Sequence, residues 1–153
     1  MKLQNVFIGV LCLACFTTVQ AQSDKEQVQA AILDYVEGIY EVQPERIKRS
    51  VHPQLMKKGF WRPQDQSAYK DETVMTFDQL VELAGKWNAK GWLPEDAPKE
   101  IEIYDVLDKT AVAKLTAYWG VDYFHLAKYD DKWMITNVLW QSLPAQEKVA
   151  QND

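Results

Sequence analysis

The hydrophobic period changes once along this chain, and that change limits the fold more than any other sequence feature. Up to about residue 90, apolar residues recur at three- and four-residue spacings, which are typical of amphipathic helices. From Ile101 to Trp140 apolar and polar residues alternate, with turn signals about every eleven residues, which indicates sequential antiparallel hairpins. Helices followed by a run of strands predict an α+β fold, with the helices packed on one face of a sheet.

Two capping boxes mark where long helices begin. Ser23 to Glu26 opens the first helix, and Thr76 to Gln79 opens another that carries apolar residues as far as Trp87. Between them, Pro44 suits the first turn of a short helix, because proline at that position loses no hydrogen bond. The sequence predicts that His52-Pro53 ends this helix, with 55–61 extended and 62–72 irregular.

Alternation in the second half predicts four strands, at 101–107, 111–119, 123–129 and 133–140. On the second strand it places three small residues on the buried face, where they leave room for a helix or a ligand: Ala111, Ala113 and Ala117. On the fourth it places Asn137 on the inner face beside Ile135, as a polar group that needs a partner.

Residues 1–21 have the features of a secretory signal peptide. An early lysine precedes an apolar run over 6–16, too short to span a membrane, and Ala21 ends an A-x-A type cleavage site. A lipoprotein signal at Cys15 is the rival interpretation, disfavoured because Cys12 stands where a large aliphatic residue is usual. We expect a periplasmic or secreted protein with a signal peptide (1–21), a single domain (22–143) and a polar C-terminal tail (144–153).

Charge and residue usage exclude several functions. The net charge of −5 gives no electrostatic footprint for nucleic acid or for an anionic membrane. Both cysteines lie in the leader, and two histidines without tight spacing predict no metal site. The chain has no glycine-rich phosphate loop, so we expect no cofactor. The remaining partners are a small molecule and a second copy of the chain.

Three motifs carry a resemblance to a known family. They are Tyr35-x-x-Gly38-x-Tyr40 followed by Arg46, His52-Pro53-x-Leu55-x-Lys57, and the closing segments Trp119 to Leu126 and Asp130 to Trp140. Together, over residues 26 to 141, they resemble the Putative lumazine-binding family of the NTF2-like (SnoaL-like) superfamily. The resemblance implies a cone: a curved antiparallel sheet wrapped around a long helix, with a cavity at the wide end. One departure is Val42-Gln43, where such proteins often have Gly-Asp, so a carboxylate expected near the cavity mouth is missing.

Two residues are candidates for acid–base catalysis. His52 near a cavity could exchange protons at working pH, although capping the short helix is the interpretation we favour. Asp122 beside an apolar cavity could have a raised pKa and act as a base, although a turn or capping role is favoured somewhat. His125 is three residues further on, so we expect it on the outer face, at a dimer surface.

Other residues are candidates for ligand binding. Trp61 and Trp92 lie in irregular segments and are predicted to cover a pocket, whereas Trp119 and Tyr35 would line it. The adjacent lysines of Lys57-Lys58 are interpreted as a solvated surface pair.

Three functions remain open at this point. The first is binding of a small, flat, apolar ligand without chemistry. The second is an isomerase, dehydratase or cyclase, with His52 or Asp122 as base and Tyr35 or Asn137 steadying an enolate oxygen. The third is a protein-interaction module that dimerises through the convex sheet face. We favour the first, because the sequence offers few residues for acid–base catalysis.

Overall fold

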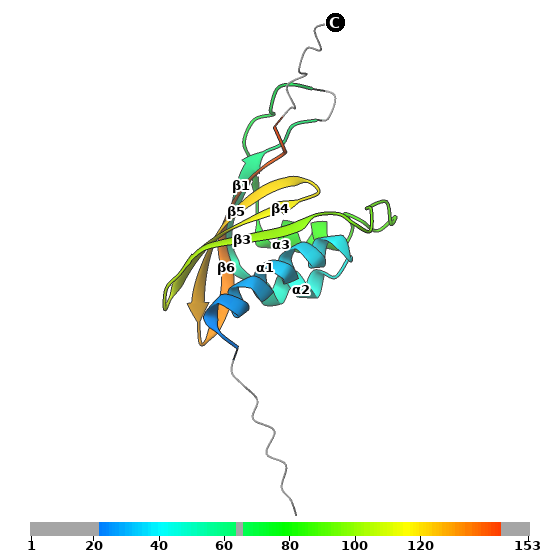
Figure 1. The fold of residues 1–153 in the computed structure, drawn as a ribbon. Coiled ribbons are helices and arrows are strands. Elements are labelled where there is room, and N and C mark those ends of the chain that lie inside the picture. The colour runs from blue at the N-terminus through cyan, green and yellow to red at the C-terminus, as the bar shows by residue number, and fades with distance from the viewer. Residues whose placement is uncertain (1–21, 64–65, 145–153) are drawn as a thin grey trace, which may run out of the picture.

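The computed structural model describes residues 22–63 and 66–144 (Figure 1). The predicted signal peptide lies outside the described residues, as does the polar tail beyond Pro144. None of the helices in the described ranges has both the length and the apolar character needed to cross a membrane. The helices are α1 (Asp24–Tyr40), α2 (Pro44–Ser50) and α3 (Phe77–Ala84). The strands are β1 (Val51–Phe60), β2 (Thr73–Met75), β3 (Lys99–Val106), β4 (Thr110–Ala117), β5 (Gly120–Tyr129) and β6 (Lys132–Gln141).

The strands form one six-stranded sheet in the order β2-β1-β6-β5-β4-β3. The four C-terminal strands form the predicted antiparallel meander. The sheet as a whole is mixed, because β1 pairs parallel with β6. The strand β1 is also longer than predicted: it starts at Val51 and passes through Pro53 at an irregularity in its pairing, where a missing N–H is tolerated.

The helices lie on one face of the curved sheet (Figure 1). Both predicted capping boxes are present, at Ser23 with Glu26 and at Thr76 with Gln79. The three alanines of β4 are buried as expected, and α1 lies against β3 and β4 on this face. The room that the alanines leave is therefore filled by a helix.

A bulge overturns the predicted orientation of Asn137. The pairing of β5 with β6 shifts by one residue between His125 and Leu126, so Asn137 lies opposite the exposed His125 and Val138 takes the buried position. A bulge reverses which residues face inward beyond it, and simple alternation cannot anticipate that reversal. Asn137 consequently lies on the outer side of the sheet, and the prediction of an inner-face asparagine is wrong.

Ion pairs tie α2 to α1. The guanidinium of Arg46 binds the carboxylates of Asp34, at 3.1 Å, and of Glu37 and Glu41, while Arg49 also binds Asp34. Burial raises the pKa of Asp34, but its bonds to Arg49 and Arg46 outweigh that effect and leave the pKa below its ordinary value. These contacts set the angle at which α2 leads into β1.

The turn after α1 places a β-branched residue in a left-handed conformation. The N–H of Gln43 donates to the carbonyl of Gly38 at 2.9 Å, the outer hydrogen bond of a Schellman motif, and Val42 in the position before it has φ of 58°. This position usually holds glycine, because a Cβ there clashes with the backbone.

Replacing Val42 with Gly should therefore raise the free energy of unfolding by up to about 1 kcal/mol, since strain in the folded state is removed at a smaller entropic cost. Urea denaturation measures the change. Val42→Ala is the matched control, because alanine keeps the Cβ and should gain little. A less stable glycine variant would contradict the assignment of strain.

Candidate functional site

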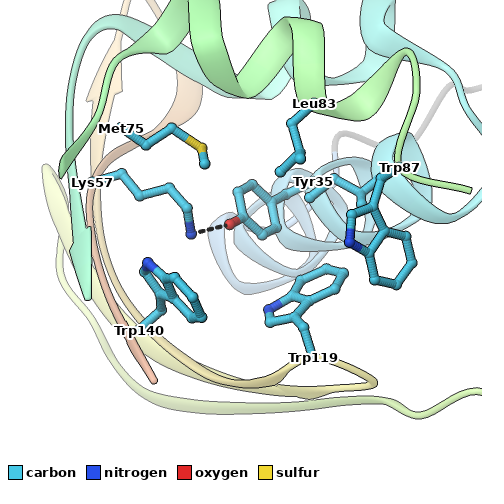
Figure 2. Close-up of a pocket in the computed structure, with 8 residues that line it drawn as sticks. Tyr35, Lys57, Met75, Leu83, Trp87, Trp119 and Trp140 are labelled. Atoms are coloured by element: carbon cyan, nitrogen blue, oxygen red, sulfur yellow. Dashed lines mark hydrogen bonds between the residues drawn. The ribbon is translucent and has the colours of Figure 1, made fainter. Parts of the chain in front are cut away.

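The alternation of side chains along β1 directs the side chain of one lysine, Lys57, into the protein interior. Leu55, Lys57 and Gly59 share the buried face, and the Lys57 side chain is only 5% exposed. Gly59 faces Trp140 on β6 so closely that a Cβ would lie 2.4 Å from the indole ring, so only glycine fits here. The absent side chain lets Trp140 lie over β1 beside Lys57 (Figure 2).

Lys57 is paired with a completely buried carboxylate. Its Nζ lies 3.1 Å from Oδ1 of Asp122 and donates to the hydroxyl of Tyr35 at 2.8 Å. The hydroxyl of Tyr35 donates to the same oxygen at 3.3 Å, and the indole N–H of Trp119 donates to Oδ2 at 2.5 Å. We call Tyr35, Lys57, Trp119 and Asp122 the buried polar cluster.

Burial and mutual charge set the protonation of the buried polar cluster. Burial lowers the pKa of Lys57, and the Asp122 carboxylate opposes that shift. Burial also raises the pKa of Tyr35 well above its ordinary value, an effect strengthened by the charge of Asp122, so the phenol stays protonated. Lys57 and Asp122 face each other as an ion pair, so the cluster as a whole carries no net charge.

A cavity of about 90 Å³ lies beside the buried polar cluster. Its lining is largely apolar and aromatic, and comes from α1, β1, β2, β6, the β4–β5 turn and the region around α3 (Figure 2): Tyr35, Ile39, Lys57, Met75, Leu83, Trp87, Trp119 and Trp140. Drug-sized ligands occupy pockets of roughly 300–1,000 Å³, so this cavity accepts only a small molecule or one ring of a larger one.

Stacked aromatic rings border this cavity. Trp87 stacks on Tyr40 with 5.8 Å between ring centroids and meets Trp119 edge-on at 5.5 Å. Trp92 packs against Trp87 at 4.6 Å, and its indole N–H donates to the Trp87 carbonyl. Trp92 is half exposed, so it covers a lining residue rather than the cavity itself.

The two catalytic candidates do not meet. His52 lies in β1, where its Nδ1 accepts from the N–H of Gln54 and its ring stacks on Tyr129 at 4.7 Å. Tyr129 ends β5 seven residues after Asp122, so His52 and Asp122 are roughly 20 Å apart along the sheet. The expectation that His52 caps α2 is also wrong, since Val51 is the C-cap and, among the described residues, no His52 nitrogen donates to a carbonyl of α2. Asp122 does bond to Trp119 across the β4–β5 turn, so part of its turn role is present.

The binding candidates divide into two groups. Tyr35 and Trp119 line the cavity as expected. Trp92 does not line it but packs against Trp87, which does. Trp61 follows β1 with its side chain half exposed and does not reach the cavity, nor does Asn137 on the outer face.

Sequence reasoning missed Lys57, Trp87 and Trp140 as parts of this site. The signal for Lys57 was present, because period two from Leu55 through Gly59 places it inward. Its charge led us to predict that Lys57 lies on the surface, since lysine is almost never fully buried unless it is paired. Its neighbour Lys58 is indeed exposed and pairs with Glu72.

Lys57→Met should destabilise the fold by about 3 kcal/mol, because it leaves Asp122 buried without its counter-charge. Lys57→Met combined with Asp122→Asn should recover most of that loss, since asparagine is neutral, its carbonyl oxygen accepts from Trp119 and its amide N–H can donate to the Tyr35 hydroxyl. Urea denaturation of both variants, with the exposed Lys58→Met as control, measures the difference. A double variant no more stable than the single one would show that charge is not the cause.

Solved structures share this fold at low sequence identity. An NTF2-like protein of unknown function from Methylobacillus flagellatus aligns with 18% identity and a TM-score of 0.55, over 81% of this chain and 95% of its own. An NTF2-like protein of unknown function from Shewanella baltica aligns with 14% identity and a TM-score of 0.55, over 78% of this chain and 94% of its own. An NTF2-like protein with a cystatin-like fold from Novosphingobium aromaticivorans aligns with 10% identity and a TM-score of 0.54, over 78% of this chain and 82% of its own.

These likenesses establish an α+β NTF2-like fold with helices against a curved, mixed sheet. No curated protein matches the chain significantly. The family model described as Putative lumazine-binding matches residues 23–141, which span α1 through β6 and include every residue of the buried polar cluster. The chain therefore belongs to the Putative lumazine-binding family.

Proposed function

We propose that this protein binds a small, flat molecule in the cavity beside the buried polar cluster. The observation that carries the proposal is an aromatic cavity whose wall includes Lys57, a buried lysine that is paired with Asp122. Such a pair is weak evidence for stability, because well-packed apolar residues often serve as well. Its place on a cavity wall favours recognition of a ligand.

The family description names lumazine, a fused two-ring compound, and we do not assign that ligand to this chain. An engineered apolar cavity of about 150 Å³ binds one benzene. The 90 Å³ here is smaller, so a single ring would fill it. The proposal is therefore for a ligand of about one small ring, or for a larger molecule of which one ring enters.

Binding is favoured over catalysis by the state of Asp122. Both of its oxygens already accept hydrogen bonds, from Lys57 and Tyr35 on one and from Trp119 on the other. A general base must also lie within hydrogen-bond reach of the substrate proton, and Asp122 is fully buried and is not among the residues that line the cavity. His52 is distant, so the acid–base reaction first considered lacks a partner for Asp122.

Native mass spectrometry of the purified full chain tests the proposal. We expect a retained mass above that of the polypeptide. Leu83→Trp should abolish it, because the larger ring enters the cavity that Leu83 lines. Leu139→Trp on the exposed outer face is the matched control and should retain the ligand. A ligand that survives Leu83→Trp, in a variant whose thermal melt shows that it is folded, would place the binding site elsewhere.

For location we propose export to the periplasm or beyond, supported by the leader-like sequence of residues 1–21. Export with cleavage after Ala21 yields a mature chain that begins at Gln22 and contains no cysteine. The same mass spectrum reports this cleavage if the protein is expressed in a bacterium and recovered from the periplasm.

A homodimer through the sheet is the second proposal, and one observation favours it. The outer face exposes large apolar side chains on neighbouring strands, among them Val112, Tyr123 and Leu139. Tyr123 lies directly opposite Leu139 in the pairing of β5 with β6. Clustered exposed apolar residues mark interaction surfaces more often than scattered ones do.

Leu139→Glu should convert such a dimer to a monomer, because it places a charge at the centre of an apolar contact. Light scattering coupled to size exclusion measures the mass. Leu107→Glu, in the exposed β3–β4 turn, is the control and should leave the mass unchanged. A wild-type protein that is already monomeric at high concentration would sink the dimer proposal.

A further inference from the structure

The cavity wall offers hydrogen-bond donors that the protein does not use. An ammonium has three N–H groups, and Lys57 donates two of them, one to Tyr35 and one to Asp122. Among the described residues, no protein acceptor takes the third N–H of Lys57 or the indole N–H of Trp140. The Nζ of Lys57 lies over the Trp140 ring, 5.2 Å from its centroid, and both side chains line the cavity (Figure 2).

The same wall has no matching surplus of acceptors. Asp122 accepts from three donors, and the hydroxyl of Tyr35 both accepts from Lys57 and donates to Asp122. The other lining side chains, such as Ile39, Met75 and Leu83, are apolar. A ligand here therefore meets donors from one side and apolar surface from the others.

The charges of the site also restrict its ligand. Lys57 and Asp122 neutralise each other inside the protein, at 5% and 0% exposure. An ionic ligand would add a buried charge with no counter-charge, which is unfavourable. A neutral ligand keeps the balance and still meets the ammonium as a donor.

We propose that the cavity selects a neutral molecule bearing a carbonyl-type oxygen, with Lys57 and Trp140 as the donors that determine specificity. This inference rests on the proposed binding function and names the chemical class of its ligand. A carbonyl oxygen has two lone pairs and brings no donor of its own, so it suits a wall that presents N–H donors. Gly59 supports this geometry, because any side chain there would displace the Trp140 indole.

Four small probes of similar size test the proposal: cyclopentanone, methylenecyclopentane, cyclopentylammonium and cyclobutanecarboxylate. Each is titrated into the ¹⁵N-labelled full chain, and the indole N–H resonances are followed by NMR. We expect cyclopentanone to shift the Trp140 resonance and to bind about ten-fold or more tightly than methylenecyclopentane, which has the same shape without the oxygen. Both ions should bind more weakly than the ketone.

Trp140→Phe keeps an aromatic ring and removes only its N–H. It should weaken cyclopentanone several-fold and leave methylenecyclopentane unchanged, a difference that a general loss of packing would not produce. Lys57→Met with Asp122→Asn should remove most of the ketone preference while keeping the site neutral. Lys58→Met is the matched lysine control, because that side chain is exposed and outside the cavity.

The outcomes separate this inference from the proposed function. If methylenecyclopentane or either ion binds as tightly as the ketone, the inference is wrong while ligand binding stands. If no probe shifts an indole resonance, the inference is also wrong. The retained mass in the native spectrum then decides the proposed function independently.

Discussion

The buried pairing of Lys57 with Asp122 is the constraint on which the interior of this protein depends. It joins β1 to β5, strands on either side of β6, and draws α1 in through the hydroxyl of Tyr35. A lone charge at either position would be strongly destabilising, so the two residues can change only together. The pair fixes the side of the cavity on which polar atoms occur, and the aromatic rings occupy the remainder.

The small residues in the sheet decide where space remains. The alanines of β4 accept α1 closely, so no room is left beneath that part of the helix. Gly59 instead admits the Trp140 indole, and Trp87 closes the opposite side through its contacts with Tyr40 and Trp119. Rigid rings therefore form part of the cavity wall, and they restrict its size more firmly than the flexible chains of Met75 and Leu83 that complete it.

Much of the fold follows from local signals in the sequence, because capping boxes and a change of period act within a few residues. The cavity does not, because long-range geometry creates it. A one-residue bulge opposite His125 moved Asn137 outward, and the parallel pairing of β1 with β6 brought Lys57 to Trp140 across more than 80 positions of sequence. Tyr35 and Trp119 were predicted from resemblance and residue type, whereas the partner of Asp122 was not, since lysine usually indicates a surface.

The distribution of charge outside the cavity strengthens the case for a neutral ligand. After the first helix this chain has the neutral Gln43, and the nearby carboxylates of Asp34, Glu37 and Glu41 are bound by Arg46. Lys99 binds Glu37 as well. Charges near the end of α1 are thus paired with each other, and the rings of Trp87, Trp92 and Tyr118 lie beside the cavity wall. An ion approaching this side would lose its hydration against aromatic surface and gain no unpaired counter-charge. A neutral molecule avoids that cost, and the donors of Lys57 and Trp140 then distinguish one neutral molecule from another.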